Sequence, residues 1–170
     1  TSVTTYSGNR YSLSFNMGLL DLLGGVKIYP FLPWIIILFW LTGLYFFIKT
    51  VLKLLDICLE AWKIVLISEL IILFNLALTP NWIQIFYWSS GRVPYLTPTI
   101  WIGWLFFLIL CPSPKTKWAH VLSLLAVFLI AFYIGGFSET VNFALITISM
   151  MVLLLSFLAP KLKYARAMTV

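Results

Sequence analysis

Charged side chains are scarce in this sequence. Aspartate, glutamate, lysine and arginine together make up 9% of the 170 residues, whereas 62% of the residues are hydrophobic. Water-soluble domains carry far more charge than this, so the composition excludes an ordinary soluble protein. The net charge of +6 does not indicate a nucleic acid partner, because the basic residues mostly flank apolar stretches, where they meet lipid head groups. We expect the lipid bilayer, and no nucleic acid, as a partner of this chain.

Residues that bind metals or act as nucleophiles are also few. The chain has two cysteines, Cys58 and Cys111, and one histidine, His120, and these form neither a CxxC pair nor a histidine cluster. No glycine-rich phosphate loop, HExxH sequence or nucleophile elbow occurs. We therefore predict no metal site, and these patterns identify neither a cofactor nor a catalytic residue.

Five long apolar stretches account for most of the chain. They run over residues 29–48, 64–78, 97–110, 118–134 and 141–159. An apolar helix of about 20 residues crosses the hydrocarbon core of a bilayer, so the stretches predict an all-α, polytopic transmembrane helix bundle of about five spans. Residues 1–28 then form an exoplasmic segment, residues 29–159 the bundle, and residues 160–170 a basic cytoplasmic tail.

Basic residues alternate between the two sides of these spans. Three basic residues follow the first stretch, two follow the third and three follow the fifth. On the opposite side, two precede the first stretch, one lies between the second and third stretches, and none lies between the fourth and fifth. By the positive-inside rule, we expect the N-terminus outside and the C-terminus in the cytoplasm. The richer side holds Lys49, Lys53, Lys63, Lys115, Lys117, Lys161, Lys163 and Arg166, and the other side holds Arg10, Lys27 and Arg92.

Two segments outside the spans have the pattern of short amphipathic helices that lie along the membrane surface. In the first, apolar residues recur at helical spacing from Ser12 to Leu23, and the Gly24–Gly25 pair ends the helix. In the second, Val51–Trp62, apolar side chains face one way and charged ones the other. This pattern predicts an interfacial helix that leads into the second span.

The outer segment before the third span contains an arginine among aromatic residues. Arg92 follows Trp88 and precedes Tyr95. A guanidinium group forks onto phosphate oxygens, and aromatic faces stack on sugars, so these residues suit a sugar phosphate. The alternative is that Arg92 binds lipid phosphates and that the aromatic residues anchor the chain at the membrane surface.

Glu69 is a carboxylate inside an apolar stretch. A charged group in the hydrocarbon is costly, so we expect this side chain to point into the helix bundle. Asn75, further toward the outer side, would extend an intramembrane polar track. Two interpretations stay open: a functional one, in which Glu69 is an ion or proton site or supports the outer pocket, and a structural one, in which it forms an interhelical hydrogen bond.

Two pieces of the outer segments resemble bacterial membrane glycosyltransferases of the GT-C class. Tyr6–Tyr11, with the sequence YSGNRY, is similar to a Trp/Tyr-x-Gly-Arg-Tyr/Phe element that precedes an amphipathic helix in the first large outer loop of such proteins. Tyr87–Leu96, YWSSGRVPYL, is similar to a Trp-x-x-Gly-x-x-x-Tyr-Leu element before a later span. The resemblance covers most of the chain up to about Leu110, and Asn9 is inserted relative to the first element.

The resemblance implies a protein of the bacterial inner membrane that transfers a sugar from a polyprenyl-phosphate donor at the outer face. Cations would stabilise the leaving phosphate. The chain opens with Thr1 and a polar outer stretch, which usually follows an earlier span, so we expect it to be part of a longer polypeptide. Proteins of this class place an acidic base in the first outer loop, which residues 1–5 do not supply, so that base would lie upstream. The substrate-binding residues that the resemblance implies are Arg10, Tyr11, Trp88, Arg92 and Tyr95.

The composition also fits a different class of protein, one without catalytic activity. A non-catalytic small subunit of a larger membrane complex would also be rich in apolar and aromatic residues on wide helix faces. Its partners would be other membrane subunits rather than a lipid-linked sugar. The sequence leaves this alternative open.

Overall fold

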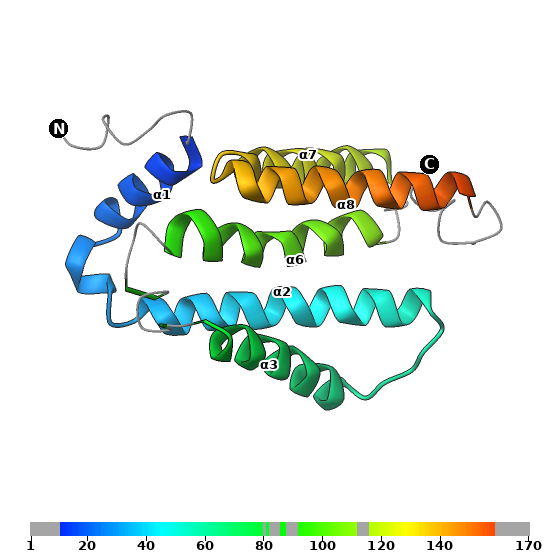
Figure 1. The fold of residues 1–170 in the computed structure, drawn as a ribbon, viewed down its shortest axis with the longest axis horizontal. Helices are drawn as coiled ribbons and strands as arrows, with labels where there is room; N and C mark the ends of the chain where they lie inside the picture. The colour runs from blue at the N-terminus through cyan, green and yellow to red at the C-terminus, as the bar shows by residue number, and fades with distance from the viewer. Residues whose placement is uncertain (1–10, 80, 82–85, 88–91, 112–115, 159–170) are drawn as a thin grey trace.

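The computed structural model describes residues 11–79, 81, 86–87, 92–111 and 116–158 (Figure 1). The regular elements over these residues are helical, which confirms the predicted all-α class. They are α1 (Tyr11–Leu22), the 3₁₀ turn η1 (Gly25–Ile28), α2 (Leu32–Leu54), α3 (Ala61–Ala77), the π-helical turn η2 (Arg92–Leu96), α6 (Thr97–Leu110), α7 (Lys117–Gly135) and α8 (Glu139–Leu158).

The long helices lie side by side, and the chain reverses direction from each one to the next (Figure 1). α2 packs between α3 and α6, α6 packs on α7, and α7 packs on α8. α1 crosses one end of this set and contacts α7 and η2. The main contacts therefore join the helices as a row rather than as a closed bundle. Wide apolar faces stay exposed as a result, and only 6% of the most apolar window of α7 is buried.

Among the described residues, three helices are long and apolar enough to cross a membrane. They are Leu32–Leu54, Val93–Leu110 and Lys117–Gly135. These helices are compatible with an integral membrane protein. The other two expected spans correspond to α3, which has 17 residues, and to α8, whose described apolar part is Glu139–Met151. Their crossing of the bilayer stays a prediction.

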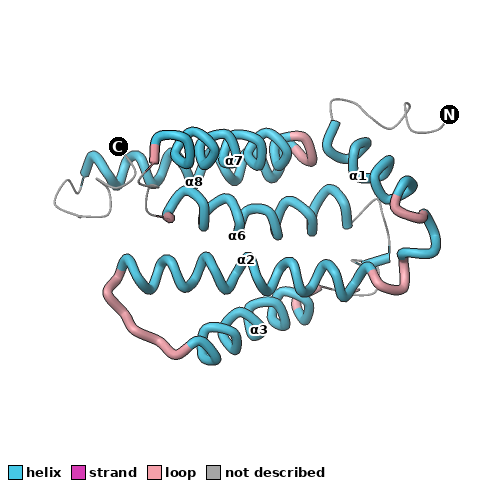
Figure 2. Tube along the Cα trace, turned by 180° about the vertical axis from the view of Figure 1, so that it is seen from behind, coloured by secondary structure: helices cyan, strands magenta, loops and turns pink. Residues whose placement is uncertain are grey.

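The connecting segments gather at two opposite ends of the row. One end, which we call the α1 end, carries α1, η1 and the turn between α7 and α8 (Figures 1 and 2). The other end, which we call the α2–α3 loop end, carries the loop between α2 and α3. Lys27 lies in η1, whereas Lys53 lies in the last turn of α2. This separation agrees with the alternation of basic residues, and the side of the membrane that each end faces stays a prediction.

The interfacial helix predicted over Val51–Trp62 is wrong. Its first residues continue α2, which ends at Leu54, and α3 begins at Ala61. Between the two helices Asp56 has a φ of 56°, a left-handed conformation that interrupts a right-handed helix. The apolar spacing that predicted a separate helix is the spacing of the last turn of α2. The predicted first helix is confirmed as α1, and both glycines after it have positive φ.

Glycine allows α2 and α6 to approach closely. A Cβ atom at Gly103 would lie 3.6 Å from the backbone carbon of Gly43, and one at Gly43 would lie 2.7 Å from the Trp104 indole nitrogen. That nitrogen donates a hydrogen bond to the backbone oxygen of Phe39 at 3.2 Å. Nearby, α2, α3 and α6 share an apolar core. The buried residues of this core are Trp40, Ile72, Phe86, Leu96 and Ile100.

Candidate functional site at the α1 end

Polar side chains hold α1 against the end of α7. The Tyr11 hydroxyl donates a hydrogen bond to the backbone oxygen of Phe132 at 2.5 Å. The Ser12 hydroxyl donates to the backbone oxygen of Tyr133 at 2.6 Å, and the Asn16 amide donates to the Tyr133 hydroxyl. Ser12 is fully buried in this contact. Ring contacts act beside these hydrogen bonds, because the Tyr11 ring stacks on Phe132 with centroids 4.7 Å apart and the Phe15 ring meets Tyr133 edge-on at 6.3 Å.

Gly136, in the turn after α7, lets α1 come this close. A Cβ atom at Gly136 would lie 2.3 Å from the Ser12 hydroxyl oxygen and 2.5 Å from a ring carbon of Tyr11. The backbone N–H of Ser12 also donates to the Gly136 oxygen at 3.3 Å. The preceding carbonyl, that of Gly135, accepts from the Asn142 side chain at 2.8 Å. Side chains of α1 and α8 thus donate hydrogen bonds to backbone carbonyl groups in the last turn of α7.

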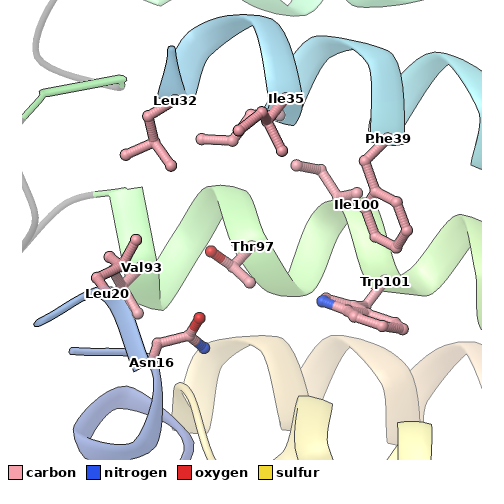
Figure 3. Close-up of a pocket in the computed structure, with 10 residues that line it drawn as sticks. Asn16, Leu20, Leu32, Ile35, Phe39, Val93, Thr97, Ile100 and Trp101 are labelled. Carbon is pink, nitrogen blue, oxygen red and sulfur yellow. The ribbon is translucent and has the colours of Figure 1, made fainter. Parts of the chain in front are cut away.

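A cavity of about 140 Å³ lies between α1, α2 and the start of α6 (Figure 3). Asn16 lines it from α1, and Thr97 and Trp101 line it from α6. The rest of its wall is apolar, and none of the described residues that line it is ionisable. Sites for drug-sized ligands measure about 300–1,000 Å³, so this cavity suits a small polar group or part of a lipid chain. It supplies no acid or base.

The predicted substrate-binding residues are only partly described. Tyr11 is bound to α7 through its hydroxyl, so this side chain anchors α1. Tyr95 is 57% exposed on η2. Arg92 begins η2, but its side chain lies outside the described part of the structure, as do Arg10 and Trp88. Because a leaving phosphate needs cations, we expect Arg10 and Arg92 to approach each other across one outward-facing cavity, and this expectation stays a prediction.

The expected inward position of Glu69 is wrong. The buried face of α3 consists of Ile64, Ser68 and Ile72, whereas Glu69 and Asn75 are exposed. The Asn75 amide donates to a backbone oxygen of its own helix at 2.8 Å. Within the described ranges, the Glu69 carboxylate has no hydrogen bond or ion pair. Six helical positions of 100° separate the two residues by about 120° around the axis, so they form no common polar track.

Sequence reasoning missed the residues that hold α1 to α7. Ser12 and Asn16 are four positions apart, the spacing of one helix face, and this was a usable signal for a polar docked side. The Gly135–Gly136 pair was a second signal, because paired glycines after an apolar helix often mark a tight turn. Neither signal identified α7 as the partner of α1.

Comparison of this chain with protein-family models, with curated proteins and with solved structures finds no match.

Proposed function

We propose that this chain forms part of a membrane glycosyltransferase that binds a polyprenyl-phosphate sugar at the α1 end. The observation that supports this proposal is the contact between α1 and η2. α1 directly follows the first sequence element of the resemblance, and η2 lies within the second element. Two elements that are about 80 positions apart in the sequence thus lead into the same end of the molecule.

The chemistry of the proposed site rests on its arginines. Arg10 directly precedes Tyr11, whose hydroxyl is fixed on α7, and Arg92 is the first residue of η2. Two guanidinium groups would bind the phosphate of the donor and stabilise its charge as the sugar leaves. The cavity between α1, α2 and the start of α6 would offer Asn16 as a polar group and apolar walls for the first part of a polyprenyl chain. The base that deprotonates the acceptor comes from outside the described residues.

A binding measurement with polyprenyl phosphate tests this proposal. Arg92→Gln should weaken binding of polyprenyl phosphate to the purified chain by about 10- to 100-fold, because a hydrogen bond to a charged group contributes about 1.5–3 kcal/mol. Arg92→Lys should retain part of the affinity, since it keeps the charge but loses the forked geometry. Lys27→Gln removes the same charge at the same end and is the matched control.

Two results would contradict the proposal. In one, Arg92→Gln binds polyprenyl phosphate as tightly as the unmodified chain. In the other, Lys27→Gln loses as much affinity as Arg92→Gln, which would mean that only the general positive charge of this end attracts the phosphate.

The exposed position of Glu69 favours a second candidate function, that of a subunit in a larger membrane assembly. Glu69 lies beside the exposed apolar residues Leu66, Leu70 and Leu73 on α3. A carboxylate that faces hydrocarbon costs at least about 2.5 kcal/mol, and a donor group on a partner helix would remove that cost. In this case α3 is the interface of the chain.

Photo-crosslinking in native membranes tests the subunit candidate. A photoreactive residue at position 73, one turn from Glu69, should form a protein adduct of defined mass. Glu69→Leu should abolish this adduct, because the polar contact that orients the partner is lost. The same photoreactive residue at position 124 of α7 is the control for non-specific contacts. Adducts with lipid alone at position 73 would contradict the subunit function.

A further inference from the structure

A second cavity lies at the α2–α3 loop end, at the opposite end of the row from the candidate site at the α1 end. It measures about 340 Å³ and is enclosed by the second half of α2, the α2–α3 loop and the start of α3. Figure 2 shows how this loop joins the two helices at that end of the row. Most of the wall is apolar. The apolar residues of the wall include Leu52, Ile57, Leu59 and Ile64.

Two lysines of α2 also line this cavity. Lys49 and Lys53 are four positions apart, so their Cβ atoms lie on one helix face about 5–6 Å apart. Both side chains are exposed. The Lys49 ammonium lies 3.5 Å from the Tyr45 hydroxyl and 5.4 Å from the centroid of the Tyr45 ring, which also lines the cavity. The tyrosine therefore keeps this ammonium at the cavity.

The acidic residues nearby leave both lysines available. Glu60 forms an ion pair with Lys63 at 3.0 Å, and it also accepts a hydrogen bond from the Trp62 indole at 2.8 Å. Asp56 is exposed in the loop and forms no ion pair with any residue in the described part of the chain. The cavity thus combines an apolar wall with two lysines that form no ion pair within the described residues, and Asp56, next to Ile57, is an acidic group of the same loop.

We propose that this cavity binds an anionic phospholipid, with its phosphate on Lys49 and Lys53 and the upper part of its acyl chains on the apolar wall. Charge complementarity selects an anion, and the apolar wall selects one that carries hydrocarbon. The position near the end of a membrane-crossing helix is the depth at which phospholipid head groups lie. This inference is independent of the proposed sugar transfer, because it concerns the opposite end of the molecule.

The test measures binding of phosphatidylglycerol and phosphatidylcholine to the full chain in a neutral detergent by native mass spectrometry. The unmodified chain should bind phosphatidylglycerol in preference to phosphatidylcholine. The double change Lys49→Gln and Lys53→Gln should weaken phosphatidylglycerol binding about 25-fold, since each lysine near a phosphate contributes about fivefold. Replacing both lysines by arginine should preserve binding. The double change Lys27→Gln and Lys117→Gln removes the same charge elsewhere and should have no effect.

Three results would overturn the inference. The double glutamine variant could bind phosphatidylglycerol as tightly as the unmodified chain, or the two phospholipids could bind equally well. Alternatively, inorganic phosphate could displace the lipid at similar concentrations, which would identify a site for free phosphate instead. If the double glutamine variant does not fold, Ile57→Glu, which places a negative charge at the cavity, should weaken phosphatidylglycerol binding, and unchanged binding would overturn the inference.

Discussion

The contact between α1 and the α7–α8 turn yields a sharp prediction for Gly136→Ala. The backbone of Gly136 has φ −84° and ψ 4°, which alanine adopts without strain. The added methyl group would nevertheless lie 2.3 Å from the Ser12 hydroxyl oxygen and 2.5 Å from a Tyr11 ring carbon. Both distances are far inside van der Waals contact, so the Ser12 hydroxyl and the Tyr11 ring must move away from the turn, by themselves or together with α1.

The size of the effect follows from the hydrogen bonds that this movement breaks. Three are at risk: the bonds from the Tyr11 hydroxyl, from the Ser12 hydroxyl and from the Ser12 backbone N–H. Each contributes about 0.5–1.5 kcal/mol net, and replacing glycine by alanine returns about 0.4–1 kcal/mol through the unfolded chain. We expect the docking of α1 to weaken by about 1–3 kcal/mol.

Hydrogen–deuterium exchange of residues 11–22 measures this docking directly. In Gly136→Ala, the amides of α1 should exchange about 5- to 150-fold faster than in the unmodified chain, while those of α6 should not change. Gly135→Ala is the matched control, because its Cβ atom would meet its nearest neighbours at 3.7 and 3.8 Å. The reasoning is refuted if Gly136→Ala exchanges normally or if both alanine variants exchange equally fast.

Three further predictions concern the row of helices and its orientation. Gly43→Ala places a Cβ atom 2.7 Å from the Trp104 indole nitrogen and should lower the free energy of unfolding by about 1–3 kcal/mol. Gly103→Ala, whose Cβ atom would have its nearest contact at 3.6 Å, should have a much smaller effect. Equal losses in the two variants would contradict the close packing of α2 and α6. Glu69→Gln should leave the unfolding temperature of the isolated chain unchanged, because the carboxylate makes no bond within the described residues, and a clear decrease would show otherwise. In a cysteine-free background, a membrane-impermeant thiol reagent should label a cysteine at position 139 from outside the cell but not one at position 53, and the reverse pattern would invert the topology.

The sequence predicted the long helices well, because their apolar stretches are bounded by strong local signals. The third stretch matches α6 to the residue, since Pro98 lies in the first turn of this helix and the polar segment after Leu110 follows its end. The boundary between α2 and α3 was not predictable in the same way. It depends on the left-handed backbone conformation of Asp56, which the spacing of apolar residues does not reveal.

The direction of the side chains around each helix was much harder to predict. α3 is apolar on nearly every side, so its sequence does not indicate which face packs on α2. The expectation that Glu69 points inward rested on the cost of a charge in hydrocarbon. Among the described elements, however, α2 is the main neighbour of α3, and most of the α3 side chains are exposed. For the same reason, the docking of Ser12 on α7 depends on tertiary contacts that local periodicity does not encode.

The bonds between α1 and α7 have a consequence for the order of events during synthesis. The hydroxyl groups of Tyr11 and Ser12 bind carbonyl groups that lie 121 positions later in the chain. At about 5–20 residues per second, a ribosome needs about 6–24 s to make that intervening length. During this interval α1 has emerged but its docking partner does not yet exist, so its polar side must be hydrated or held by another molecule. Final assembly of the α1 end is therefore a late step that waits for α7 to be inserted and turned.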